Sequence, residues 1–310
     1  SQHCKLNKFK IFFLCSELLD GKNAQTTHVL ELFKNFRRET ETYLFAPKLF
    51  SLSYLNTEKN LIFVPTVNIP IFRHVFFEIF LFFKLIRYII KIKPNIMYVR
   101  HSIVLYTYII ISKIFNIPYV LEVNGLARNQ FNVFSLDSGF IKKKFIKFFS
   151  RINEYISFNH ASKIVVVTSG IKENILKSYN VNPRKIIVVH NGANTDMFKP
   201  VDKNKAKTEL GLNKNVKYVG FSGSFISWHG LEQLVNSAFQ IFKENKNIEF
   251  ILIGDGALKK KIKHMVKKLN MKNRFIFIDR VPYEDVPKYL NAFDIAVILK
   301  QKNVPGSPLK

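Results

Sequence analysis

Residues 218–235, which read YVGFSGSFISWHGLEQLV, decide the fold class of this chain. They begin as a short apolar strand, turn at closely spaced glycines and continue as the first turns of an amphipathic helix. A helix that starts behind a strand in this way points backbone N–H groups and the positive end of its dipole at one place. That place suits a phosphate, although an ordinary strand-to-helix turn of an α/β protein has the same pattern.

Glycine spacing and one histidine bear on that choice. Gly220, Gly223 and Gly230 would let the backbone turn tightly and let an anion approach closely. His229, directly before the last glycine, could donate a hydrogen bond or carry a charge there. These residues alone leave the phosphate site and the plain turn equally open, so the rest of the chain must decide.

Strand and helix patterns alternate along the whole chain. The strands expected before residue 193 are 9–15, 41–46, 60–65, 95–100, 118–123, 163–168 and 185–190, and the helices are 26–37, 75–92, 103–115, 139–159 and 169–178. After a polar break, the expected strands are 216–222, 248–253, 274–278 and 294–299, and the helices are 230–244, 257–269 and 284–292. This alternation is typical of parallel sheets covered by helices on both faces.

The polar break predicts two domains. We expect a Rossmann-like domain over 1–195, a linker over 196–214 and a second Rossmann-like domain over 215–310. Ligands of such sheets bind at the carboxyl ends of the strands, so we expect a site between the domains. The second domain shows few strands and the chain begins at Ser1, which predicts an incomplete second domain and a chain that is a fragment.

Composition limits the classes of function. The 310 residues carry 48 Lys and Arg against 22 Asp and Glu, a net charge of +26 that favours polyanions, although A/T-rich codons would also enrich lysine. No nucleic-acid-binding motif accompanies this charge, so we expect no nucleic-acid partner. Cys4 and Cys15 form neither a disulfide framework nor a zinc pattern, and no signal peptide is visible, which fits a reducing compartment.

Two segments combine apolar and basic residues. Residues 75–92 (VFFEIFLFFKLIRYIIKI) contain four charges, which argues against a membrane span and predicts a helix that packs on a sheet rather than lies on a membrane. Residues 140–151 combine Lys142, Lys143, Lys144, Lys147 and Arg151 with four phenylalanines. This pattern fits either an anionic membrane surface or a solvated helix face over buried rings.

Eight collinear segments resemble glycosyltransferase family 4, whose members are retaining transferases of the GT-B type. The segments are 21–32 (GKNAQTTHVLEL), 118–125 (PYVLEVNG), 163–169 (KIVVVTS), 185–198 (KIIVVHNGANTDMF), 220–230 (GFSGSFISWHG), 250–256 (FILIGDG), 277–282 (FIDRVP) and 305–310 (PGSPLK). The resemblance implies two Rossmann-like domains facing a cleft, a nucleotide-diphosphate sugar as donor, no metal ion and no further cofactor. It also turns the choice at the glycine loop toward a phosphate site.

In the first domain the resemblance marks Gly21 as a glycine that approaches the diphosphate. Asn124 stands where many members carry a histidine near the reacting sugar, and an amide does not shuttle protons at neutral pH. The leaving phosphate is then the expected base. Arg100, His101 and Glu122 are candidates for the acceptor side, with a structural carboxylate as the simpler interpretation of Glu122.

In the second domain the family holds the phosphates with an arginine and a lysine, and here those positions are Ser224 and His229. The expected donor site also contains the glycines and polar residues at neighbouring strand ends: Gly223, Gly230, Gly254, Asp255, Gly256, Arg280 and Val281. Asp255 could instead cap the helix at 257–269. One family carboxylate position coincides with Pro305, and its companion would lie beyond Lys310.

The sequence therefore predicts a retaining, metal-independent glycosyltransferase. Its expected acceptor is a hydroxyl of a polysaccharide or lipid-linked glycan such as lipopolysaccharide, reached at the cytoplasmic face of the membrane. The alternative is a non-catalytic GT-B-like subunit that binds sugar nucleotides or membranes, because Asn124 and Ser224 depart from the family pattern. The donor sugar, its base, the linkage and the oligomeric state do not follow from the sequence.

Overall fold

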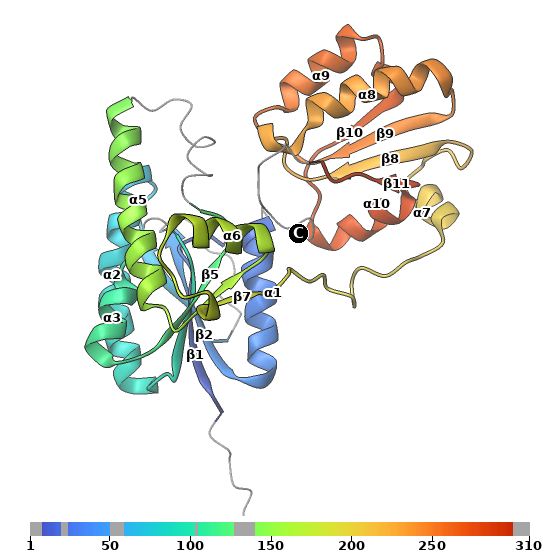
Figure 1. Ribbon diagram of the computed structural model, residues 1–310. Helices are drawn as coiled ribbons and strands as arrows, with labels where there is room; N and C mark the ends of the chain where they lie inside the picture. Colours follow the sequence, from blue (N-terminus) through green and yellow to red (C-terminus); the bar gives the residue numbers. More distant parts are fainter. Residues whose placement is uncertain (1–7, 20–23, 50–58, 103–104, 127–139, 300–310) are drawn as a thin grey trace, which may run out of the picture. The chain divides into compact units, whose positions relative to one another are not determined.

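The computed structural model describes residues 8–19, 24–49, 59–102, 105–126 and 140–299 (Figure 1). They fall into two compact units that divide between Gly192 and Ala193. Both units are built on parallel sheets with helices between most successive strands, as the alternating pattern predicts.

The first unit has a seven-stranded sheet in the order β3-β2-β1-β4-β5-β6-β7, in which all neighbouring strands are parallel. Its strands are β1 (Lys10–Leu14), β2 (Glu41–Leu49), β3 (Leu61–Thr66), β4 (Ile96–Arg100), β5 (Tyr119–Val123), β6 (Lys163–Val166) and β7 (Ile186–Val188). Its helices are α1 (Ala24–Glu39), α2 (Pro70–Ile92), α3 (Thr107–Phe115), α5 (Phe140–His160), α6 (Ser169–Ser178) and the short η1 (Pro183–Lys185). The chain runs outward from β1 to β3 and returns to β4, so the topological switch point lies between β1 and β4.

Successive residues of β1 enter two different cores. Phe12 and Leu14 pack in a core that includes residues of α2, α3 and α5, whereas Phe13 and Cys15 pack with residues of α1. Figure 1 shows α2, α3 and α5 on one side of the sheet and α1 on the other. The helix expected at 75–92 does pack on the sheet, as the sequence predicts.

The second unit has a four-stranded parallel sheet in the order β10-β9-β8-β11. Its strands are β8 (Lys217–Ser222), β9 (Ile248–Ile253), β10 (Phe275–Ile278) and β11 (Ile295–Ala296). Its helices are α7 (Lys203–Glu209), α8 (Leu231–Glu244), α9 (Lys259–Lys268), α10 (Val286–Ala292) and the short η2 (Ser227–His229), η3 (Lys272–Arg274) and η4 (Tyr283–Asp285). Helices α8 and α9 cover one face of this sheet and α7 and α10 the other (Figure 1).

Two sequence expectations in the second unit need correction, at residues 294–299 and at Gly220. Residues 294–299 were expected to be a buried strand, but β11 has two residues, and both are exposed at the sheet edge. Within 196–214, the stretch predicted as a linker, α7 packs beside α10. Gly220 lies inside β8 rather than in the turn, and a Cβ there would come within 2.1 Å of the Phe293 ring. Gly220 therefore serves packing.

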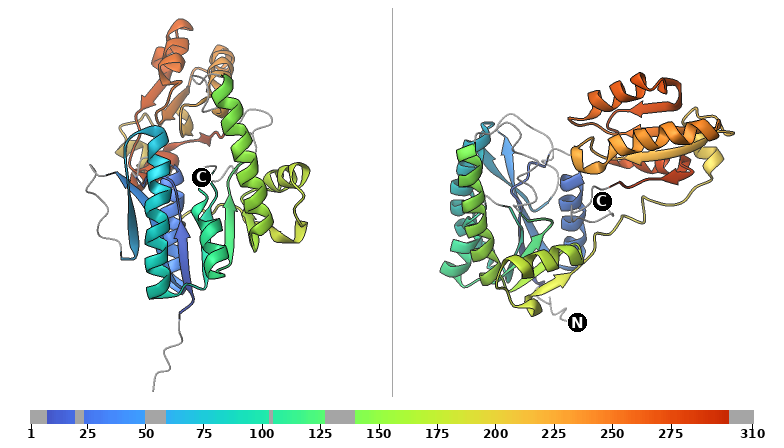
Figure 2. Two further views of the ribbon diagram at one scale, coloured as in Figure 1. Left: turned by 90° about the vertical axis from the view of Figure 1, so that its left-hand side faces the viewer. Right: turned by 45° about the horizontal axis from the view of Figure 1, so that its top comes forward.

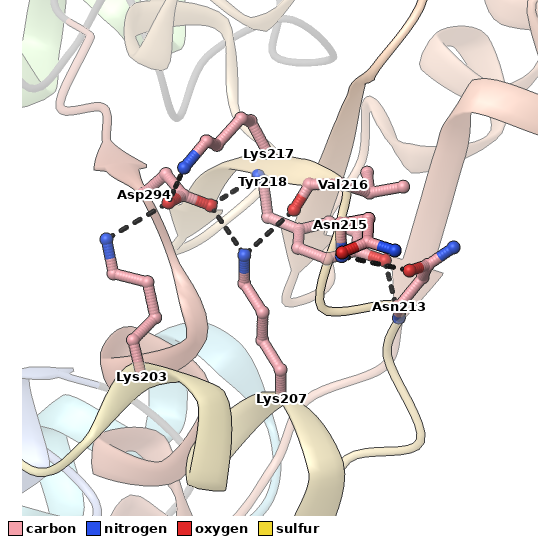
Figure 3. Close-up of polar contacts among 8 residues, drawn as sticks. All are labelled: Lys203, Lys207, Asn213, Asn215, Val216, Lys217, Tyr218 and Asp294. Carbon is pink, nitrogen blue, oxygen red and sulfur yellow. Dashed lines mark hydrogen bonds and ion pairs between the residues drawn. The ribbon is translucent and has the colours of Figure 1, made fainter.

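A charge cluster fixes α7 to the amino end of β8 (Figure 3). Asp294 Oδ2 lies 2.9 Å from the buried Lys207 Nζ and accepts from Tyr218 N at 2.9 Å, and its Oδ1 lies 3.0 Å from Lys203 Nζ. Burial alone would raise the pKa of Asp294, but the hydrogen bonds from Lys207, Tyr218 and Lys203 hold it well below its ordinary value. Because β8 ends at Ser222, this cluster lies at the opposite end of the strand from the glycine loop.

Candidate functional site

Glu122 is the centre of a polar cluster at the carboxyl edge of the first sheet. Its side chain is 2% exposed. Oε1 lies 2.7 Å from His28 Nε2 and accepts from Arg100 Nη1 at 3.1 Å, while Oε2 accepts from Tyr98 OH at 3.1 Å. The Asn124 side-chain amide also donates to Oε1. These partners come from α1, from β4 and from the residue after β5, so the fold gathers them beside the topological switch point.

The charge state of Glu122 determines which ring nitrogen of His28 carries the proton. Burial alone would raise the pKa of this carboxyl, but the hydrogen bond from His28 and the charge of Arg100 lower it to about 2. The ionised carboxylate only accepts hydrogen bonds, so His28 donates through Nε2–H. In the neutral ring Nδ1 is then the basic nitrogen, and the side chain is 27% exposed.

We did not expect His28 at this site from the sequence. It lies within residues 21–32, one of the segments that carry the family resemblance, but the helical pattern there indicates only an apolar face. A histidine just behind a glycine loop was the available signal. Gly21, expected in that loop, lies outside the described residues.

The other acceptor-side candidates separate in the structure. Arg100 is buried and pairs with Glu122. His101 lies instead against α5, with Nε2 3.8 Å from Glu154 Oε1 and its ring 5.5 Å from the Phe158 ring. The His101 side chain is 3% exposed, so it packs inside the first unit. Their roles toward an acceptor stay predictions.

Cys15 directly follows β1 at the same edge of the sheet. It is fully buried, as the apolar run predicts, and burial raises the pKa of its thiol to about 12. A thiol in this state is not a nucleophile at neutral pH.

At the carboxyl edge of the second sheet, two loops hold each other. Gly223 N donates to Ile253 O at 3.0 Å, and Phe225 N donates to Asp255 O at 2.9 Å. Leu258 N donates to Phe225 O at 2.9 Å. The loop after β8 and the loop after β9 are therefore one hydrogen-bonded structure built from main chain.

Glycine is required where these loops meet. Gly254 and Gly256 have φ values of 133° and 151°, which favour glycine. A Cβ on Gly254 would lie 1.9 Å from Gly223 O, and one on Gly256 would lie 2.6 Å from Phe225 O. No other residue type allows this close approach.

The expected phosphate residues lie at the start of α8. Gly230, with φ 58°, is its N-cap, and no side chain caps the helix. His229 Nδ1 lies 2.6 Å from Ser224 O; because a carbonyl only accepts, Nδ1 carries the proton. The His229 ring also meets the Phe221 ring edge-on at 5.8 Å. The helix dipole and the His229 ring are thus held at the glycine loop.

Lys259 is a second residue that we did not expect from the sequence. Its Nζ donates to Gly254 O at 2.7 Å and to Asp279 Oδ1 at 2.5 Å, and its side chain is 10% exposed. The hydrogen bond and charge of Lys259 lower the pKa of Asp279. Lys259 begins a run of three lysines at a helix start, a pattern that is typical of a solvated surface. The sequence therefore does not indicate that Lys259 lies behind the loop at Gly254.

The remaining donor-side candidates are placed as follows. The Asp255 carboxylate accepts from Gly256 N at 2.8 Å, and Leu258 is the N-cap of α9, so the alternative that Asp255 caps this helix is wrong. Arg280 is exposed, while Val281 packs partly against the core around Tyr218. Pro305 lies outside the described residues.

Two family models match the chain. The model of Glycosyltransferase Family 4 covers residues 25–197, and that of Glycosyl transferases group 1 covers residues 202–309. The first alone covers more than half of the chain. The chain belongs to glycosyltransferase family 4. The resemblance drawn from the sequence segments is confirmed.

Curated relatives match a part of their length. The D-inositol 3-phosphate glycosyltransferase of Corynebacterium glutamicum is 24% identical over 157 residues, which are 48% of this chain and 38% of the relative. The Escherichia coli UDP-Gal:alpha-D-GlcNAc-diphosphoundecaprenol alpha-1,3-galactosyltransferase is 25% identical over 162 residues, 51% of this chain and 41% of the relative. The matched region spans less than half of either relative.

Among solved structures, Anabaena Alr3699/HepE in complex with UDP-glucose is similar, with a TM-score of 0.68 at 17% sequence identity. The match covers 94% of this chain and 74% of that one. The predicted fold class, a GT-B fold with two Rossmann-like parallel-sheet domains, is confirmed.

Proposed function

We propose that this member of glycosyltransferase family 4 transfers a sugar from a nucleotide-diphosphate sugar to a hydroxyl of a polysaccharide or lipid-linked acceptor. The observation that carries the proposal is the pair of interlocked glycine loops at the carboxyl edge of the second sheet. Their glycines allow a close approach to the backbone, and α8 begins beside them. The UDP-glucose bound by the similar HepE structure supports a donor of this class.

The leaving diphosphate carries a spread negative charge, and preorganised donors stabilise such a charge as the glycosidic bond breaks. The second unit offers the N–H groups of the first turn of α8, the α8 dipole, the His229 ring and the buried Lys259 ammonium behind Gly254. With Ser224 and His229 in place of the family arginine and lysine, we propose that backbone and dipole supply most of this stabilisation. Metal independence and retention of anomeric configuration are part of the proposal.

The acceptor would meet the carboxyl edge of the first sheet. There the ionised Glu122 orients the Asn124 amide and the His28 ring, which are groups that hydrogen-bond sugar hydroxyls. The name of the Escherichia coli relative contains a diphosphoundecaprenol-linked acceptor, which supports the lipid-linked class. Synthesis of cell-surface glycans, including lipopolysaccharide, follows from such an acceptor.

We place this activity at the cytoplasmic face of the membrane, with the protein attached peripherally. Lipid-linked acceptors and the net charge of +26 support this location. Of the helices within the described ranges, none is long and apolar enough to cross a bilayer. The side chains of Lys142, Lys143, Lys144 and Lys147 lie outside those that the structure describes.

A non-catalytic sugar-nucleotide-binding subunit is the second candidate, favoured by Asn124 at the place of the family histidine. Calorimetry with UDP-, GDP- and ADP-sugars, followed by a transfer assay with the bound donor, separates the two. The enzyme proposal expects binding of one base class and sugar release that depends on an acceptor. Binding without transfer would favour the subunit, and no binding at all would overturn both.

A further inference from the structure

Helix α2 is apolar on the side that faces away from the sheet as well as on the side that faces it. Phe77, Leu81, Leu85 and Ile89 pack in the core. The opposite side carries seven apolar side chains that are 39% to 66% exposed: Phe72, Val75, Phe76, Ile79, Phe80, Phe83 and Ile90. A helix that is hydrophobic all round is normally covered on all sides, and an exposed apolar patch marks an interaction surface.

The exposed apolar surface continues over α3 and α5. Ile110 and Ile114 on α3 are exposed, as are Phe148, Phe149, Ile152 and Tyr155 on α5. In the left view of Figure 2 the cyan α2 and the green α5 face the viewer together. We call the exposed side of α2, α3 and α5 the outer helical face.

Buried polar contacts fix these helices to one another. Glu78 Oε2 on α2 accepts from Tyr106 N at 3.0 Å and from Thr107 N at 2.7 Å at the start of α3. Tyr108 OH on α3 donates to Ser157 Oγ on α5 at 2.7 Å. Hydrogen bonds therefore link the three helices that form the outer helical face.

The charges on the outer helical face have one sign. Arg87, Lys91, Lys113 and Arg151 are exposed. The acidic residues described on these helices are Glu78, which binds the start of α3, and Glu154, which is buried. Among the described side chains of the three helices, no carboxylate is exposed.

We propose that the outer helical face docks on an anionic lipid bilayer, with the α2 phenylalanines at the boundary of the acyl chains and the basic side chains among the headgroups. An amphipathic surface of this kind binds by apolar burial together with attraction to anionic lipids. A symmetric dimer through this face would bring this basic patch, with Arg87, Lys91, Lys113 and Arg151, against the same patch of the second copy, and the described side chains of these helices include no exposed carboxylate to pair it. The charges therefore favour lipid over a second copy.

The direction of α2 determines which edge of the first sheet lies at each end of the docking surface. Thr66, at the carboxyl end of β3, donates through Oγ1 to Arg73 O at 2.6 Å, so the start of α2 lies at the same edge of the sheet as Glu122. At the other end, Lys10 Nζ of β1 donates to Ile92 O at 3.1 Å. Phe72 and Phe76 thus lie at the edge where the acceptor is proposed to bind, and Lys91 lies at the far edge. The position of Phe72 and Phe76 beside an acceptor site rests on the proposed function, whereas binding to the bilayer itself needs no sugar transfer.

Flotation of the full-length protein with vesicles of equal parts phosphatidylcholine and phosphatidylglycerol tests the apolar contribution. We expect Phe83→Gln to weaken the vesicle partition coefficient by about tenfold, because a large buried ring is lost from the interface. Phe9→Gln is the matched control, since Phe9 is also half exposed but lies at the amino edge of the sheet. It should leave the partition coefficient unchanged.

A second pair of variants, with equal changes in net charge, tests what the basic side chains contribute to vesicle binding. Replacing Arg87, Lys91 and Lys113 together by Gln should weaken binding by roughly 100-fold at low salt, and wild-type binding should fall as salt rises. Replacing Lys214, Lys246 and Lys272, which are exposed in the second unit, changes the net charge equally and should have a much smaller effect.

Three results would overturn the proposal: no wild-type binding to the anionic vesicles, equal effects of Phe83→Gln and Phe9→Gln, or a lipid-free dimer that Phe83→Gln dissociates. Circular dichroism and nucleotide-sugar calorimetry on each variant show whether it is folded. Vesicle binding without nucleotide-sugar binding would overturn the proposed function alone, and the reverse result would overturn the docking proposal alone.

Discussion

The carboxyl edges of the two sheets differ in construction: side chains form the first, and main chain forms the second. At the first edge, side-chain hydrogen bonds form the site: Glu122 is ionised inside the protein and orients His28, Asn124 and Arg100. At the second edge, main chain forms the site: the glycine loops hold each other through N–H and C=O groups, and the N–H groups of the first turn of α8 lie beside them. Directional side chains suit hydroxyl groups, whereas converging N–H groups suit a diffuse phosphate charge. The two edges should therefore respond to different perturbations.

Loss of the Glu122 carboxylate should have the largest effect. Glu122→Ala leaves the buried Arg100 charge without its partner, which should lower the free energy of unfolding of the first unit by about 3–5 kcal/mol. Hydrogen exchange of β5 peptides in urea measures it. Glu173→Ala, at a carboxylate that is 66% exposed, should cost less than about 0.5 kcal/mol. Similar losses for both would show that burial of the pair does not matter.

A methyl group at Gly254 should act on the second unit alone. Gly254→Ala sets a Cβ against Gly223 O at a φ of 133°, which should cost roughly 3–4 kcal/mol of unfolding free energy and nucleotide binding with it. Hydrogen exchange of β8 and β9 peptides in urea follows this unit. Gly192→Ala, where no atom lies within 4 Å, should change little. A stable Gly254→Ala protein would contradict the loop packing.

Acid should weaken the first unit through Glu122. Its folded pKa of about 2 lies below the unfolded value of about 4.3, so the stabilisation is complete above the unfolded value and is lost as pH falls toward 2. The loss is on the order of 3 kcal/mol. In pH-dependent exchange of β5 peptides, Glu122→Gln should abolish this dependence. The second unit should keep its own acid sensitivity in that variant, since Asp294 has a lowered pKa there.

The smallest effect is expected at His229. His229→Ala removes the bond to Ser224 O and one ring from the donor edge, so affinity for a nucleoside diphosphate should fall by about tenfold. Calorimetry measures it. His264→Ala, at an exposed position on α9, is the control and should bind normally. Unchanged affinity in His229→Ala would assign His229 a structural role.

Sequence patterns predicted one edge better than the other. The glycines at 230, 254 and 256 could be placed because main-chain geometry leaves a direct signature in residue type. His28 and Lys259 could not, since their roles depend on tertiary partners far along the chain: His28 meets Glu122, and Lys259 meets Asp279. Residues 294–299 were misjudged for the same reason, because an apolar run does not show whether a strand lies at a sheet edge.

We propose that the donor diphosphate binds main chain at the second edge, and hydrogen exchange of the full-length protein with and without a saturating nucleotide sugar tests this directly. We expect slower exchange in peptides that contain Gly223–Gly230 and Gly254–Leu258, and little change in β5 peptides around Glu122. Protection confined to the first unit, or none in either glycine loop when calorimetry shows binding, would contradict it.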